Sequence, residues 1–286
     1  MLLNTKPRRR KRSPLPILLV VMAGLAIAGY VANQRFDLMR NPFETPTPTP
    51  TATRSALSYL AEAQTYYEAG NVLQAAEAYA LAAEQEPQND EPRRQQARML
   101  VYAGKYEQAV EAARQAVAIN PDDARNQAAL AMALDWKGNY DEAYEVAQLA
   151  VQQDPLLAEA HAYLAEVLAD LGSWYQAAEE AQTAVDLNAR SVDAQRILGY
   201  TYEAQGKYSE AIPYYEKAIE LHPKLPFLYL VIGRAYRALE DYDNAVQMFR
   251  KGLESGAEDP WLRFELGKPL FQIGDPSTMI IKTNIS

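Results

Sequence analysis

A hydrophobic pattern typical of paired helices recurs along most of this chain. It is most complete between Val192 and Leu225, where Leu198 and Tyr202 fall on one face of a first helix. After Tyr208 a second stretch again places apolar residues three and four positions apart, as an amphipathic helix requires. Each stretch has room for a helix of about 14 residues, roughly 20 Å long. The pattern therefore predicts an antiparallel helical pair.

Small residues repeat with this pattern at an interval of 34 residues. Glycine can close the first helix in a left-handed conformation, and it recurs at Gly70, Gly104, Gly138, Gly172 and Gly206. Alanine permits the two helices to cross closely, and it recurs at Ala75, Ala109, Ala143, Ala177, Ala211 and Ala245. Proline cannot extend the second helix, and it follows that helix at Pro87, Pro121, Pro155 and Pro223. The chain is therefore expected to be a repeat array.

The repeated unit resembles the tetratricopeptide repeat family. Its signature is matched at Leu198, Gly199, Tyr202, Gly206, Tyr208, Ala211, Tyr215, Ala218 and Pro223. The resemblance extends over residues 56–257 as six units. It implies an all-α fold: a right-handed α-solenoid of about six helix-turn-helix units plus a partial seventh.

Two positions depart from the signature. Ala189 replaces the proline of the fourth unit, so we expect a less sharply broken connection there. Glu240 stands where the sixth unit should have glycine, and a left-handed backbone would cost it about 1 kcal/mol or more. We expect the turn to shift onto Asp241.

The last part of the chain, residues 258–286, is expected to hold a partial seventh unit and an irregular tail. Pro269 should kink or shorten its helix. Leu266, Leu270, Phe271 and Ile273 would leave this end partly exposed, which fits a docking surface, self-association or a truncated array.

The amino terminus predicts a membrane anchor. Residues 1–14 carry six positive charges, and residues 15–33 form an apolar stretch without charge. As a helix this stretch nearly spans the roughly 30 Å hydrocarbon core. The positive-inside rule then places a basic cytosolic tail before a single-pass transmembrane helix and the repeats on the extracytoplasmic side. A cleaved signal peptide is the alternative, because Ala26-Ile27-Ala28 has the small-x-small form of a cleavage site.

Residues 34–55 are expected to be an extended Thr/Pro-rich spacer. Two interpretations stay open, a stiff linker and an O-glycosylated stalk.

Charge and composition limit the function. From residue 55 onward there are 19 basic and 35 acidic residues, and the whole chain has a net charge of −9. Such an acidic array is a poor candidate for nucleic-acid binding. The chain has no cysteine and two histidines, His161 and His222. We find no catalytic constellation, metal-ligand spacing or phosphate loop, and we therefore expect no enzyme activity, metal or cofactor.

The resemblance also implies a binding surface, because in this family the first helices of successive units line a concave groove that receives a peptide or a partner helix. The positions that correspond to this groove are Arg94, Arg98, Tyr102, Arg125, Met132, Trp136, Arg196, Tyr200, Phe227, Leu230, Arg234 and Arg237. Glu159, Glu166 and Asp170 would form an acidic middle between two basic ends. The arginines either clamp a carboxylate or phosphate of a partner or pair with Glu91, Asp193 or Glu203 within the stack.

We therefore expect a membrane-tethered scaffold that binds protein or peptide partners, for envelope assembly. The alternatives are a non-catalytic recruiting or regulatory subunit of an envelope export or biosynthesis complex, a secreted binding protein after signal cleavage, and a structural spacer without ligand. Self-association through the transmembrane helix or the carboxyl-terminal end would be compatible with each.

Overall fold

The computed structural model describes residues 15–35, 54–255 and 260–274. The chain divides into two compact units, residues 1–53 and residues 54–286. The expected basic tail (1–14), most of the spacer (36–53) and the irregular tail (275–286) lie outside the described residues.

The described part of the first unit is a single helix, α1 (Leu15–Arg35). Its described side chains include Leu25, Ile27 and Tyr30, which are exposed. Within the parts of the chain that the structure describes, no helix combines the length and the apolar character needed to cross a membrane. The prediction of a transmembrane helix over residues 15–33 is therefore not supported by the structure.

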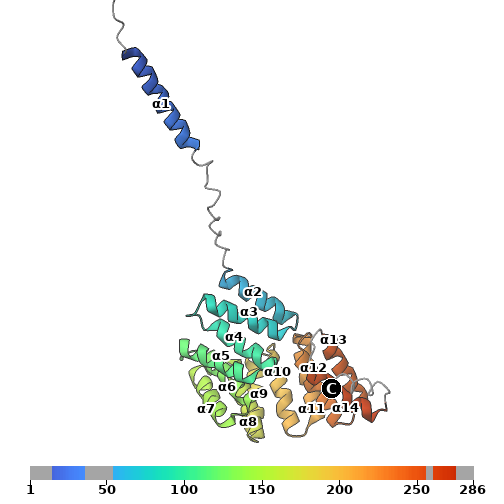
Figure 1. Cartoon of the computed structure of the whole chain (residues 1–286). Helices are drawn as coiled ribbons and strands as arrows, with labels where there is room; N and C mark the ends of the chain where they lie inside the picture. Colours follow the sequence, from blue (N-terminus) through green and yellow to red (C-terminus); the bar gives the residue numbers. More distant parts are fainter. Residues whose placement is uncertain (1–14, 36–53, 256–259, 275–286) are drawn as a thin grey trace, which may run out of the picture. The chain divides into compact units, whose positions relative to one another are not determined.

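Within its described residues, 54–255 and 260–274, the second unit has six helical pairs and one further helix, whose arrangement Figure 1 shows. The pairs are α2 (Ala56–Glu68) with α3 (Val72–Gln85), α4 (Glu91–Tyr102) with α5 (Tyr106–Ile119), α6 (Ala124–Lys137) with α7 (Tyr140–Gln153), α8 (Ala158–Asp170) with α9 (Trp174–Leu187), α10 (Val192–Ala204) with α11 (Tyr208–Leu221), and α12 (Pro226–Ala238) with α13 (Tyr242–Glu254), followed by α14 (Pro260–Gln272). The described residues contain no strand. The predicted all-helical solenoid is confirmed, and we call the even-numbered helices α2 to α14 the first helices of their units.

Small residues sit where the helices of a pair cross. The six repeated alanines are all fully buried. At Gly233 an added Cβ would lie 2.4 Å from Cε1 of Phe249, and at Gly199 it would lie 2.9 Å from the Tyr215 ring. The repeated small residues therefore allow an aromatic ring of the second helix to pack directly on the backbone of the first.

The turn inside each pair has a left-handed residue. Gly206, for example, has φ of 74°. In the sixth unit Glu240 itself takes this conformation with φ of 60°, whereas Asp241 has φ of −83°. The expectation that the turn shifts onto Asp241 is wrong. Asp241 instead caps α13 by accepting a hydrogen bond from the Asn244 N–H at 3.2 Å, which holds the turn in the position that all units share.

The connection at Ala189 is as sharp as the others, so the expectation of a weaker break there is also wrong. Helix α9 ends at Leu187 and α10 begins at Val192. The Gln195 side-chain amide donates to the Ala189 carbonyl at 2.9 Å, as the Gln127 amide does to the Pro121 carbonyl at 3.0 Å. Proline is therefore not required, because a side chain six residues further on fixes the turn.

Helix α14 forms the expected first helix of a seventh unit. It continues past Pro269 to Gln272, so the proline does not shorten it. Leu266 and Leu270 are buried against the sixth unit, whereas Phe271 and Ile273 are exposed. Only part of the predicted apolar end is therefore open to solvent.

The left-handed turn gives a direct test of the backbone argument. Glu240→Gly should stabilise the repeats by about 1 kcal/mol, because glycine adopts this conformation without the steric cost of a Cβ. Gly206→Ala is the matched control, since Gly206 has φ of 74° and no atom within 4 Å of an added Cβ. It should destabilise by a similar amount. Urea denaturation followed by circular dichroism measures both, and a lower midpoint for Glu240→Gly would contradict the argument.

Candidate functional site

Side chains of the first helices meet on one surface of the second unit, which we call the inner face. It is formed by residues of α4, α6, α8, α10 and α12, and it includes the predicted groove residues Arg98, Tyr102, Trp136, Arg196 and Phe227. These five helices belong to five successive units, so the 34-residue period places their equivalent faces on one side of the solenoid.

The carboxylate of Asp193 lies at the centre of the inner face and is fully buried. Its Oδ2 accepts from the Arg98 guanidinium at 2.8 Å and from the Tyr163 hydroxyl at 2.9 Å. Its Oδ1 accepts from the Tyr102 hydroxyl at 2.6 Å. Burial by itself would raise the pKa of Asp193, but the charges of Arg98 and Arg196 and the two tyrosine hydrogen bonds outweigh it and lower the pKa. One carboxylate thus links α4, α8 and α10.

A second buried ion pair lies beside it. Arg196 donates to Glu166 with two bonds, Nη1 to Oε1 at 2.7 Å and Nη2 to Oε2 at 2.9 Å. Burial alone would lower the pKa of Arg196, and the charge of Glu166 reverses this and raises it. The guanidinium carbon also lies 5.5 Å from the centroid of the Trp136 ring and 5.9 Å from that of Phe227. Both terminal nitrogens of Arg196 are therefore engaged within the protein, whereas its buried Nε has no hydrogen-bond partner among the described residues.

Aromatic contacts close the inner face across the solenoid. The Tyr102 ring stacks on Phe227 at 4.7 Å between centroids, and the Tyr67 ring lies 4.5 Å from His222. Gly70 meets the opposite backbone so closely that an added Cβ would be 2.0 Å from the Lys224 carbonyl oxygen. The first two units therefore contact the fifth and sixth.

This closure corrects the picture of an open groove. Of the predicted groove residues, Tyr102, Met132, Arg196 and Phe227 are buried by the protein's own side chains. Leu230 is half-buried in the packing against α14. An extended peptide cannot contact these side chains in this arrangement.

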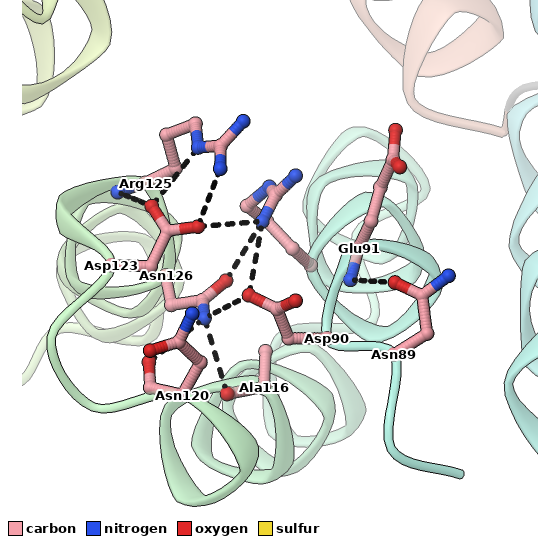
Figure 2. Close-up of polar contacts among 9 residues, drawn as sticks. Asn89, Asp90, Glu91, Ala116, Asn120, Asp123, Arg125 and Asn126 are labelled. Carbon is pink, nitrogen blue, oxygen red and sulfur yellow. Dashed lines mark hydrogen bonds and ion pairs between the residues drawn. The ribbon is translucent and has the colours of Figure 1, made fainter. Parts of the chain in front are cut away.

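The predicted basic ends are engaged in pairing between units. Figure 2 shows Asp90, Asp123 and Asn126 facing one another at the start of the second and third units. Arg94 lies 3.6 Å from Asp123 and donates to Asn126 at 3.0 Å, and Arg125 pairs with Asp123 at 2.7 Å. These contacts join the turn before α4 to the turn before α6.

At the other end, Arg234 and Arg237 both pair with Glu265 of α14, with a distance of 3.3 Å for Arg234. The structure thus pairs these arginines with carboxylates of the stack. Of the three partners expected from the sequence, Glu91, Asp193 and Glu203, the ion pair that forms is that of Asp193 with Arg98.

An acidic cluster lies at the edge of the inner face. It consists of Asp135 near the end of α6, Glu166 and Asp170 of α8, and Tyr200 of α10, which donates to Asp170. Asp135 is only 3% exposed, and its Oδ1 has no hydrogen-bond partner among the described residues. Burial, with the charges of Glu166 and Asp170 added to it, raises the pKa of Asp135 to about 9. We call these four residues the Asp135 cluster.

The turns next to the Asp135 cluster expose apolar side chains. Tyr140 and Trp174 are exposed, whereas the equivalent Tyr106 and Tyr208 of other units are half-buried. Leu171 is also exposed, and Tyr175 is 79% exposed. Asp170 raises the pKa of Tyr140 through its charge, which places the two side chains near each other. Tyr140, Leu171, Trp174 and Tyr175 are called the turn surface below.

The described residues contain no group of three side chains that could hold a metal ion. His161 has a structural position: its Nε2 lies 2.9 Å from the Pro155 carbonyl oxygen and its Nδ1 lies 2.6 Å from Glu180. His222 lies against Tyr67, and burial lowers its pKa.

Sequence reasoning missed Asp135, Tyr163 and Glu265. For Asp135 there was a signal, because the equivalent residues of the neighbouring units are Val101 and Ala169, both buried. A carboxylate at an otherwise apolar position of the repeat marks an unusual environment.

Comparison with known proteins agrees with the fold. Tetratricopeptide repeat patterns match residues 100–155, 192–225 and 228–255. The chain belongs to the tetratricopeptide repeat family. No curated protein sequence matches it.

Solved structures are similar to the chain in fold. TTC0263, a thermophilic TPR protein of Thermus thermophilus, is 24% identical, with a TM-score of 0.53 over 65% of this chain and 99% of that chain. A human IFIT1 dimer with m7Gppp-AAAA is 21% identical, with a TM-score of 0.63. The match covers 81% of this chain and spans 58% of IFIT1.

The buried Asp193 should be the strongest single contributor to closure. Asp193→Asn leaves the Arg98 charge without its partner, and we expect a loss of about 3 kcal/mol in the free energy of unfolding. Hydrogen exchange should also become faster in α2 and α4. Arg114→Gln is the matched control, because its pair with Glu142 is exposed and should contribute less than about 1 kcal/mol. Equal effects of the two substitutions would refute the central role of Asp193.

Proposed function

We propose that this chain is a scaffold that binds protein partners at the turn surface and the adjoining edge of the inner face. The observation that carries the proposal is the exposure of Tyr140, Leu171, Trp174 and Tyr175 beside the Asp135 cluster. Aromatic side chains are enriched at protein interfaces, and a preformed helical surface binds without a large ordering cost. Tetratricopeptide repeats support the same general role in protein–protein interaction.

The inner face favours recognition over a purely structural role. A spacer needs no buried ions, because a buried ion pair stabilises a fold no better than well-packed apolar residues do. Here Asp193, Arg196 and Glu166 are buried together in one surface. Their pairing also fixes the helices that carry the Asp135 cluster, so the partner meets a rigid edge.

A nucleic-acid ligand is less well supported. The human IFIT1 structure holds m7Gppp-AAAA, whose phosphates are anionic. In this chain the inner-face arginines, Arg98 and Arg196, are both paired with carboxylates, and the net charge is −9. We therefore propose protein partners only.

Selection of peptides from a displayed library tests this function. The full-length chain should enrich a common sequence motif. Trp174→Ala with Tyr175→Ala should reduce binding of the enriched peptide at least tenfold, because both rings are exposed and belong to the proposed surface. The matched control, Arg114→Ala with Glu142→Ala, changes an exposed pair between α5 and α7 and should bind as the wild type does. Failure to enrich any motif, or equal binding by both double variants, would overturn the proposal.

We further propose that residues 15–33 tether the scaffold to a membrane, with the amino terminus cytosolic and the repeats extracytoplasmic, for assembly at a cell envelope. The support is the uncharged apolar stretch after six positive charges. After alkaline extraction of membranes from cells that express the full chain, the protein should stay in the membrane pellet. A variant that lacks residues 15–33 should be released. Release of the unaltered chain would contradict the tether.

A further inference from the structure

The Asp135 cluster contains more negative than positive groups. Its three carboxyl groups are Asp135, Glu166 and Asp170, and the guanidinium beside them is that of Arg196. Both terminal nitrogens of this guanidinium are used by Glu166, at 2.7 and 2.9 Å. Among the described residues no cationic side chain pairs with Asp135 or Asp170. The cluster is therefore short of one or two positive charges.

Asp135 carries the clearest sign of an incomplete site. It is 3% exposed, and its Oδ1 has no hydrogen-bond partner among the described residues. A buried acceptor without a donor destabilises the protein, because it has lost its hydrogen bonds to water and gained none in return. Asp135 shares a hydrogen bond with Asp170, and its pKa of about 9 means that it holds a proton at neutral pH. The proton therefore reduces the negative charge of Asp135 and Asp170, as a bound cation would.

The position of the two carboxyl groups also favours a cation. Asp135 lies in the last turn of α6, and Asp170 is the last residue of α8. The negative ends of two helix dipoles therefore meet at the cluster. Asp170 is exposed, so the cluster can be reached from solvent beside the turn surface.

We propose that Asp135, Asp170 and Tyr200 form a binding site for the cationic side chain of a lysine or arginine of a partner protein. The inference rests on the proposed function and names the chemistry of the partner. The cation enters beside Asp170, packs against the Tyr200 ring, and reaches the unpartnered oxygen of Asp135. Its arrival displaces the proton of Asp135 to solvent, so the charge of the cluster remains compensated. The turn surface holds the apolar residues that flank the cation in the partner.

The groups facing Asp135 determine how binding depends on pH. They are Glu166 and Asp170 of α8, Arg196 and Tyr200 of α10, and Tyr140 of α7. Because a proton leaves when the cation binds, affinity should rise with pH, by up to about tenfold per pH unit below the pKa of Asp135. An ordinary surface carboxylate, already ionised at neutral pH, would give no such slope.

Titration of the full-length protein with N-acetyl-arginine amide tests the site. The chain has three tryptophans, and Trp136 is adjacent to Asp135, so the Trp136 indole N–H signal in a ¹⁵N NMR spectrum is a local reporter. N-acetyl-arginine amide should shift this signal, whereas N-acetyl-citrulline amide, which has nearly the same shape and no charge, should not. Between pH 6 and pH 8 the arginine probe should bind more tightly as pH rises.

Two substitutions decide whether the cluster is responsible. Asp135→Asn with Asp170→Asn should weaken binding of the arginine probe at least tenfold, and the exposed control Glu142→Gln should not. If the double variant does not fold, as judged by circular dichroism, Asp170→Asn alone at the exposed position should give a smaller loss of the same kind. An equal shift with citrulline, or unchanged binding by the folded variants, would overturn the cation site. A displayed peptide that binds the turn surface without lysine or arginine would overturn it too, and would leave the proposed scaffold function intact.

Discussion

The arrangement of the repeats depends on one buried carboxylate. Asp193 receives hydrogen bonds from Arg98, Tyr102 and Tyr163, which come from the second and fourth units. A buried charge is tolerated only when it is paired and hydrogen-bonded. The energy of this group therefore favours the curvature that brings the donors together. The stacking of Tyr102 on Phe227 and the contact of Tyr67 with His222 belong to the same closed state.

Closure limits which side chains are open to solvent. The inner face is occupied by side chains of the protein itself, so the exposed residues that we propose contact a partner lie at its edge, around Asp170, Trp174 and Tyr175. The buried ion pair of Glu166 with Arg196, behind that edge, fixes the position of α8 relative to α10. Rigid support of this kind allows a few exposed side chains to recognise a partner without a large loss of conformational entropy.

The packing of the two helices within one unit could be predicted from the sequence. The crossing of α10 with α11 depends on Gly199 and Ala211, and both follow from the period of 34 residues. Glu240 was harder, because the tertiary arrangement of α12 and α13 overrides the backbone preference of a single residue. Contacts across the inner face could not be derived, since small rotations between successive units add up over the array. The approach of Gly70 to Lys224 depends on that sum, and so does the burial of the predicted groove residues.

A crosslink across the inner face tests closure most directly. The chain contains no cysteine, so Tyr67→Cys with His222→Cys introduces the only two thiols, at positions whose native rings lie 4.5 Å apart. A short bis-maleimide should join them rapidly within one folded chain, whereas Tyr67→Cys with Tyr175→Cys should react only at the separate thiols. Absence of the internal crosslink in a variant with the native circular dichroism spectrum would show that the first and fifth units do not meet, and would contradict the closed inner face.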